Sequence, residues 1–303
     1  MKIETIKLWE DREDVELTCF VNIEDQLFGG LENPVMRPAV IVCPGGAYQN
    51  CPRHGIEGDS VAMTYAVDGF QAFVLEYSIA QKAPQEKTLF PAQIFDLGKA
   101  FLTIREHAAE WHIDTEKIAV CGFSAGAHLC SMYASTWHEG LLAERFGCDN
   151  SLFRPMAAVL IYGIYDYVLQ EKYNSRIQDG PFGEWNVPVF GCEKPDEETL
   201  KRYSPVSHVS EYMPPAFLAA ATDDNLVSPM NTIRMAEKLQ EMGRPYECHM
   251  FQYGQHGFAL GHNLFEPFRK ELEHACAQWV PLSKTFLMHL VSPDTLKADP
   301  FAK

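Results

Sequence analysis

Long apolar runs, a surplus of cationic residues and paired metal-binding spacings are all missing from this sequence of 303 residues. No apolar stretch reaches the roughly 18 residues of a membrane span, and the first residues lack the cationic start and apolar core of a signal peptide. Lys and Arg number 25 against 41 Asp and Glu, and the net charge of −16 disfavours nucleic acid as a partner. We therefore expect a cytoplasmic protein without membrane or nucleic-acid partners, for which neutral or cationic small substrates remain open.

The nine cysteines form no Cys-x-x-Cys pair and no Cys/His spacing typical of zinc. Several, such as Cys43, Cys121 and Cys130, lie in apolar patterns where a thiol acts as a small hydrophobe. We expect reduced thiols and no metal site. Repeats, low-complexity tracts and an interdomain linker are also missing, which favours one domain over residues 1–303.

The order of apolar segments predicts an α/β fold. The first 23 residues alternate polar and apolar side chains, which indicates an antiparallel hairpin at a sheet edge. Buried strands then alternate with helices, a pattern typical of parallel βαβ units. Strands are expected at 39–43, 71–77, 117–121, 157–162, 216–221 and 246–251, and the clearest helices at 58–67 and 92–111. The result is a mostly parallel, doubly wound sheet with an N-terminal antiparallel hairpin.

Residues 167–213 interrupt this alternation. The segment is polar, contains four prolines and has too few apolar residues for a core of its own. We interpret it as a small cap-like insertion or substrate-facing loop within the single domain. The alternative is a surface loop without a functional role.

The pentapeptide Gly122-Phe123-Ser124-Ala125-Gly126 directly follows an apolar run and directly precedes a helix-like stretch. Gly-x-Ser-x-Gly in this setting is typical of a nucleophile elbow, where the flanking glycines remove Cβ atoms that would collide in the tight turn. Ser124 is therefore the candidate nucleophile. The competing interpretation is a glycine-rich turn with an incidental serine.

A serine hydroxyl needs an imidazole to accept its proton and a carboxylate to orient that imidazole. The strand expected at 216–221 is followed by Asp223 and Asp224. Asp224 stands three residues before Val227, the offset usual for such acids, so we favour it. Asp223 is interpreted as a turn residue that accepts backbone hydrogen bonds.

The candidate base is His256, in the glycine-containing loop that follows the strand expected at 246–251. Among the other histidines downstream of the aspartates, His249 and His262 lie nearest to His256 in the sequence. His249 falls inside the strand, where a packed or surface histidine is the usual finding, and His262 comes six residues later.

The third requirement is an oxyanion hole, a set of backbone N–H groups aimed where negative charge develops. The turn Pro44-Gly45-Gly46-Ala47-Tyr48 ends an early strand. We expect the amides of Gly46, Ala47 and Ala125 to be the donors. An ordinary Pro-Gly-Gly turn is the alternative.

From about residue 39 to 279, the chain resembles the α/β-hydrolase superfamily, and within it the hormone-sensitive-lipase-like and acetyl-xylan-esterase-like branches. Besides the elbow, the resemblance rests on Pro44-Gly45-Gly46-Ala47-Tyr48, Phe90-Pro91-Ala92-Gln93-Ile94-Phe95-Asp96, Trp111-His112-Ile113-Asp114, Tyr203-Ser204-Pro205-Val206 and His256-Gly257-Phe258. It implies hydrolysis of carboxylic esters, often acetyl groups on sugars, without metal or organic cofactor. The chain departs from the family pattern at Pro44, Ala47 and Ser228, where histidine, glycine and proline are usual.

Together these residues predict a serine esterase that forms an acyl-serine on short-chain esters, with acetylated sugars or xylan fragments as candidate substrates. An amidase or peptidase of the same fold, and a binding protein on a hydrolase scaffold, are the alternatives. Four aromatic residues could stack on a sugar or form the core of the cap: Tyr48, Tyr173, Phe182 and Trp185. The sequence specifies no oligomeric state.

Overall fold

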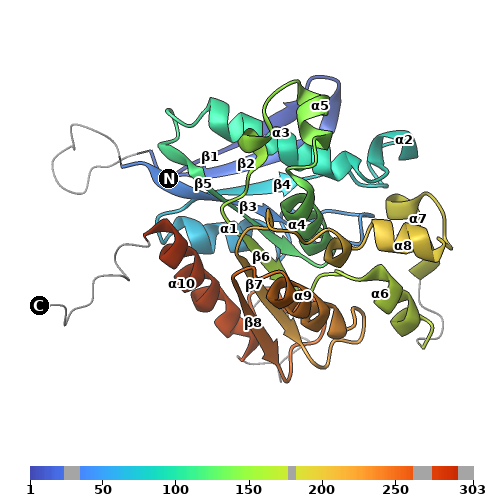
Figure 1. Ribbon diagram of the computed structural model, residues 1–303. Coiled ribbons are helices and arrows are strands. Elements are labelled where there is room, and N and C mark those ends of the chain that lie inside the picture. The colour runs from blue at the N-terminus through green and yellow to red at the C-terminus, as the bar shows by residue number, and fades with distance from the viewer. Residues whose placement is uncertain (24–34, 177–181, 262–274, 293–303) are drawn as a thin grey trace, which may run out of the picture.

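A computed structural model describes residues 1–23, 35–176, 182–261 and 275–292, and its centre is an eight-stranded sheet (Figure 1). The strands are β1 Lys2–Trp9, β2 Arg12–Val21, β3 Arg37–Cys43, β4 Gln71–Glu76, β5 Ile113–Phe123, β6 Ala158–Ile161, β7 Ala216–Ala221 and β8 Tyr246–Phe251. Their order is β1-β2-β4-β3-β5-β6-β7-β8. All neighbours from β4 to β8 are parallel, whereas β1 and β2 are antiparallel to each other and β2 is antiparallel to β4. The predicted fold class and N-terminal hairpin are confirmed.

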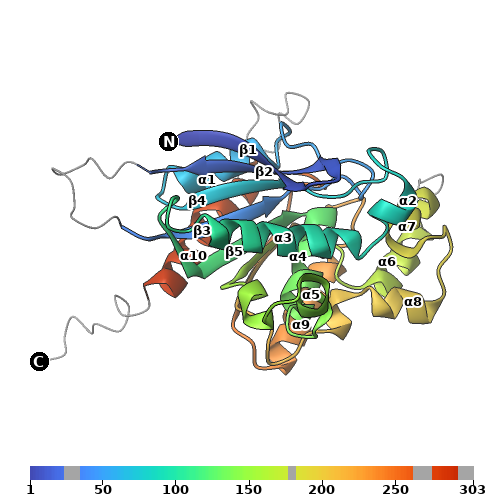
Figure 2. The ribbon, with the colours of Figure 1, turned by 90° about the horizontal axis from the view of Figure 1, so that it is seen from above.

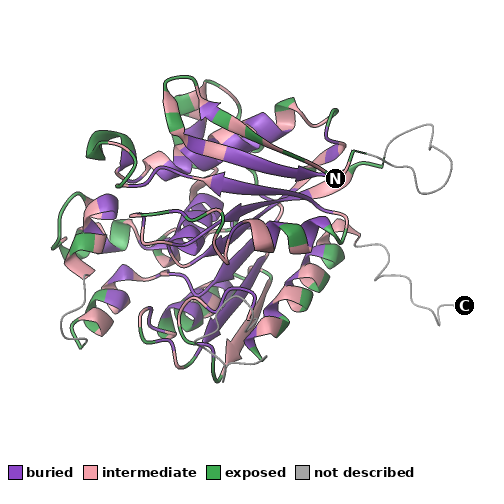
Figure 3. Ribbon diagram, turned by 180° about the vertical axis from the view of Figure 1, so that it is seen from behind, coloured by how far each residue is buried: buried purple, intermediate pink, exposed green. Residues whose placement is uncertain are grey.

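Helices cover both faces of the sheet (Figure 2). One face packs against α1 Asp59–Ala66 and α10 Trp279–Val291, and the other packs against α3 Ala92–Glu106, α4 Ala125–Thr136 and α9 Met230–Glu241. Side chains alternate across the central strands, so Val40 and Val42 join the first layer while Ala39 and Ile41 join the second. The central strands are buried along their length (Figure 3). Burial on both faces explains why these strands read as continuous apolar runs.

The boundary between α3 and β5 differs from the prediction. The helix expected to run to residue 111 ends at Glu106, and the strand expected from 117 begins at Ile113. His112 has a φ of 53°, a conformation that interrupts both elements. Trp111 is nonetheless 1% exposed and packs 5.5 Å from the ring of Phe73. Trp111 is buried although it lies in a turn. The apolar pattern typical of a helix therefore continues in the sequence past the end of α3.

Residues 167–213, which interrupt the alternation of strands and helices, are more helical than their polar composition suggested. It contains α6 Tyr167–Asn174, α7 Phe182–Phe190 and α8 Glu197–Arg202, while residues 177–181 lie outside the described ranges. Two aspartates cap these helices, since Asp166 accepts from the amide of Leu169 and Asp196 from that of Thr199. The three helices gather beyond the carboxyl ends of the parallel strands, beside α2 Gln85–Thr88 (Figures 1 and 2). None of the helices in the described ranges combines the length and apolar character needed to cross a bilayer.

Candidate active site

Ser124 occupies the tight turn between β5 and α4. Its φ of 50° and ψ of −116° lie in a strained region for a residue with a side chain. A Cβ on Gly122 would collide with the carbonyl oxygen of Gly126, and a Cβ on Gly126 with that of Cys43. Only glycine therefore fits at both positions, which accounts for the spacing of the pentapeptide.

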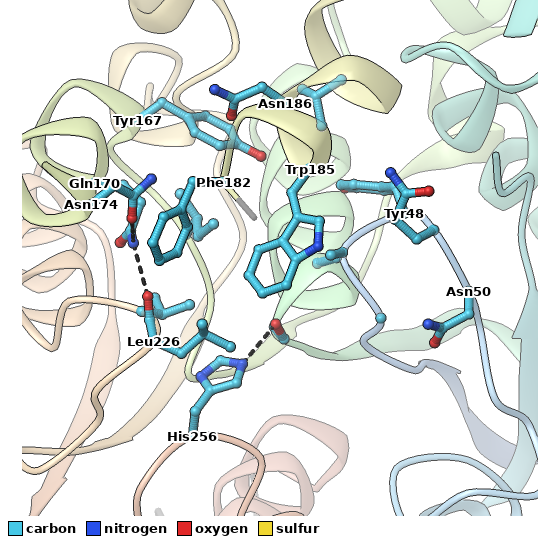
Figure 4. A pocket seen from close by; sticks show the side chains of 18 of the residues that line it. Tyr48, Asn50, Tyr167, Gln170, Asn174, Phe182, Trp185, Asn186, Leu226 and His256 are labelled. Atoms are coloured by element: carbon cyan, nitrogen blue, oxygen red, sulfur yellow. Dashed lines mark hydrogen bonds between the residues drawn. The ribbon is translucent and has the colours of Figure 1, made fainter. Parts of the chain in front are cut away.

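Three residues from separate loops form one hydrogen-bonded chain. His256 Nε2 lies 2.9 Å from Ser124 Oγ (Figure 4), and His256 Nδ1 lies 2.8 Å from Asp224 Oδ2. Because an ionised carboxylate only accepts, Nδ1 carries the proton and Nε2 is free to accept one from the serine. Ser124, Asp224 and His256 follow β5, β7 and β8, so the carboxyl ends of parallel strands bring them together.

The loop after β7 distinguishes the two aspartates. Asp224 Oδ1 accepts hydrogen bonds from the amides of Leu226 and Val227, both at 2.9 Å, which fixes the carboxylate and explains its offset from Val227. Its side chain is 1% exposed. Asp223 instead accepts from the amide of Gln255 at 2.8 Å and so anchors the loop that carries the histidine.

His249 and His262, the histidines nearest to His256 in the sequence, are not part of this chain of hydrogen bonds among the described residues. His249 lies in β8, with Nε2 2.7 Å from a carboxylate oxygen of Glu247. Its place in the strand keeps it out of the hydrogen-bonded chain of Ser124. His262 lies outside the described residues.

The loop after β3 offers unpaired amides beside the serine. Gly46 and Ala47 have φ values of 125° and 52°. Within the described part of the chain, no group accepts a hydrogen bond from the N–H of Gly46, Ala47 or Ala125. These three amides are free to bind an oxyanion. The preceding amide of Gly45 is already committed to the carboxylate of Glu57 at 2.7 Å.

A cavity of about 310 Å³ lies in front of Ser124 (Figure 4). Trp185 and Phe182 extend into it from α7, with their rings edge-on and 5.6 Å apart. The lining combines apolar side chains with several amides: Gly46, Ala47, Tyr48, Gln49, Asn50, Glu57, Ala125, Ile164, Tyr167, Gln170, Asn174, Phe182, Trp185, Asn186, Val189, Leu226, Val227 and His256.

Tyr48 borders this cavity but does not present its hydroxyl to it. The side chain is 2% exposed, and the hydroxyl lies 2.7 Å from Nδ1 of His128. Burial lowers the pKa of His128 to about 4, so its imidazole is neutral, and Nε2 donates to the Tyr203 carbonyl at 2.9 Å. Nδ1 then accepts from Tyr48, which ties the glycine loop to α4.

Tyr173 does not border the cavity and lines a neighbouring depression instead. Its hydroxyl donates to the backbone oxygen of Asp224 at 2.9 Å. This position does not support the expectation that Tyr173 contacts substrate, because its hydroxyl turns toward the loop that carries Asp224. Tyr167, Phe182 and Trp185 are the aromatic residues of the insertion that line the cavity.

Several residues of the site were not singled out from the sequence. Gln49, Asn50 and Glu57 all line the cavity from the segment between β3 and α1, which carries no recognisable period. Gln49 also donates to the backbone oxygen of Glu184 at 3.2 Å and so joins this segment to α7. The described residues contain no group of three or more His, Cys, Asp or Glu arranged for a metal ion.

The doubly wound sheet and the serine on a strand-to-helix turn define an α/β hydrolase. The chain belongs to the BD-FAE family of α/β hydrolases, which matches residues 31–239. It is similar to endo-1,4-beta-xylanase B of Butyrivibrio fibrisolvens (29% identity, 79% of this chain, 35% of that protein). It is also similar to the acetylxylan esterase of Xylanibacter ruminicola (26% identity, 85% of this chain, 46% of that protein). The chain thus spans less than half the length of either relative.

A solved structure resembles the whole described fold. An α/β hydrolase enzyme from a Medee basin deep-sea metagenome library aligns with a TM-score of 0.70 and 28% identity. The alignment covers 96% of this chain and 98% of that one. The resemblance stated from the sequence motifs is confirmed.

Proposed function

We propose that this protein is a serine esterase that hydrolyses short-chain carboxylic esters, with acetyl groups on sugars or xylan fragments as the favoured substrates. The observation that carries the proposal is the hydrogen-bonded chain from Ser124 through His256 to Asp224, facing three unpaired amides. The names of the relatives, a xylanase and an acetylxylan esterase, support the choice of substrate.

The reaction proceeds in two acyl-transfer steps. Ser124 Oγ attacks the ester carbonyl while its proton passes to His256 Nε2, and the carbonyl electron pair becomes an oxyanion held by the amides of Gly46, Ala47 and Ala125. The carbon–oxygen bond to the alcohol breaks, and His256 protonates the departing oxygen. Water then attacks the acyl-serine by the same route and releases the acid. Asp224 orients His256 and stabilises its cationic form.

The cavity supports a small substrate. Its volume of about 310 Å³ is at the lower end for ligand sites, and an acyl group would lie against apolar walls such as Ile164 and Val227. The amide side chains of Asn50 and Asn186 supply partners for hydroxyl groups of the alcohol.

We also propose that residues 1–303 form one domain in which residues 167–213 act as a cap. Tyr167, Gln170, Phe182 and Trp185 of α6 and α7 line the cavity opposite the catalytic loops. A cap in this position selects the substrate, because its side chains face the part of the substrate away from the serine.

Hydrolysis of an aryl acetate by the wild-type protein and by Ser124→Ala tests the proposal. The variant should lose at least about 10³-fold in kcat, because the nucleophile is removed. Aryl amide hydrolysis is measured in parallel and should be far slower than ester hydrolysis. An unchanged rate in Ser124→Ala would overturn the esterase mechanism, and a preference for the amide would favour an amidase.

A further inference from the structure

The carboxylate of Glu57 joins two loops of the active site. Glu57 Oε2 accepts from the amide of Gly45 at 2.7 Å, and Oε1 accepts from the Tyr162 hydroxyl at 2.7 Å. The space between these groups is tight. A Cβ placed on Gly45 would lie 2.7 Å from Glu57 Oε2 and 3.0 Å from the Cβ of Ser124. The carboxylate is therefore packed against the glycine loop, close to the nucleophile and at the wall of the cavity.

Tyr162 continues this connection to the histidine loop. Its hydroxyl accepts from the amide of Ala259 at 3.1 Å, three residues after His256. Its ring packs edge-on against the His256 imidazole, with centroids 5.0 Å apart. Tyr162 is 1% exposed, and burial together with the charge of Glu57 raises the pKa of its phenol. The hydroxyl thus remains protonated and donates to Glu57.

The two hydrogen bonds also affect how strongly the negative charge of Glu57 acts on the oxyanion hole. A free carboxylate beside an oxyanion hole would repel the developing negative charge. Here each oxygen accepts one hydrogen bond, from the Gly45 amide and from the Tyr162 phenol, and these two donors offset part of the negative charge. Holding the Gly45 peptide in place fixes the direction of the next two amides, those of Gly46 and Ala47.

We propose that Glu57 is a positioning residue that holds the oxyanion loop and the His256 loop in their reactive arrangement through Gly45 and Tyr162. The proposal rests on the esterase function proposed above. Because preorganised donors act mainly on the transition state, loss of this connection should lower kcat more than it raises KM.

The test compares Glu57→Gln, Tyr162→Phe and the double variant in hydrolysis of an aryl acetate. Active sites are counted by labelling with a fluorophosphonate to completion, so that kcat refers to folded protein. Glu57→Gln keeps only one acceptor oxygen and should lose about 10- to 100-fold in kcat, with KM within about twofold. The double variant should lose little more than Glu57→Gln alone, because both changes break one connection.

The matched control is Asp59→Asn, a carboxylate of the same segment that pairs with Arg53 at 3.0 Å. It should keep the wild-type kcat. The proposal is overturned if kcat per labelled site in Glu57→Gln stays within twofold of wild type, if the single losses multiply in the double variant, or if Asp59→Asn loses as much. A wild-type protein without esterase activity or labelling would instead contradict the proposed function itself.

Discussion

Two adjacent aspartates follow β7, and only one of them contacts the histidine. Asp224 binds His256 through one oxygen and two backbone amides through the other, whereas Asp223 binds the amide of Gln255. The offset from Val227 favoured Asp224 in the sequence, and the structure gives the physical reason. The Val227 amide donates to the carboxylate three residues before it.

This difference predicts unequal effects of two isosteric changes. Asp224→Asn should lower kcat by roughly 10³- to 10⁴-fold, because an amide donor facing Nδ1 selects the wrong tautomer of His256. Asp223→Asn keeps a carbonyl oxygen for the Gln255 amide and should change kcat by less than about threefold. Steady-state kinetics on an aryl acetate measure both. Equal losses would contradict the assignment of Asp224.

His128 predicts how stability depends on pH. Its pKa in the folded protein is lowered to about 4 by burial, from an ordinary value of 6.5. Below about pH 6.5 the unfolded chain binds a proton at this residue that the folded chain does not bind until about pH 4. The free energy of unfolding therefore falls as the pH is lowered through this window, by about 2 kcal/mol between pH 6.5 and 5.

Urea unfolding at pH 7 and pH 5 checks this expectation. In His128→Gln the fall in unfolding free energy between the two pH values should be smaller than in wild type by about 2 kcal/mol. His54→Gln is the control, because the His54 side chain is 79% exposed. An identical pH dependence in wild type and His128→Gln would contradict a neutral, buried imidazole.

At the scale of elements, the strand-to-helix turn depends on its glycines. Gly126→Ala should lower the free energy of unfolding by about 2 kcal/mol or more, because the new methyl group meets the Cys43 carbonyl. Gly183→Ala, in α7, places its methyl 3.4 Å from the Cβ of Glu193, an ordinary van der Waals contact, and should be nearly neutral. Denaturant unfolding measures the free energy of unfolding of both variants. Equal losses of this free energy would contradict the claim that the close approach of α4 to β3 requires glycine at position 126.

The helix α7 predicts a change in acyl preference. Trp185→Ala removes an indole from the cavity, and the ratio of kcat/KM for a butanoate ester to that for an acetate ester should rise about tenfold. Tyr212→Ala is the control, because this aromatic side chain is 51% exposed and outside the cavity. An unchanged ratio in Trp185→Ala would mean that the indole does not limit the length of the acyl group.

On the scale of the whole molecule, the features that could be predicted from the sequence are those that depend on local apolar periodicity and on the spacing of motif residues. The order of strands and helices followed from apolar periodicity, and Ser124, Asp224 and His256 followed from their positions at strand ends. The helices of residues 167–213 were not predicted, because they are short and each buries only a few apolar side chains, such as Tyr167, Val189 and Leu200, in the core. Glu57 was missed for a related reason. Its partners, Gly45 and Tyr162, are brought to it by the fold and not by sequence spacing.

The acyl-enzyme is the most direct test of the account. Wild-type protein mixed with an aryl acetate and quenched in acid within the first turnovers is digested and examined by mass spectrometry. The account predicts one acetyl group on the peptide that contains Ser124, and its disappearance in Ser124→Ala. Rapid ester hydrolysis with no acetyl group on that peptide, or an acetyl group on another residue, would contradict it.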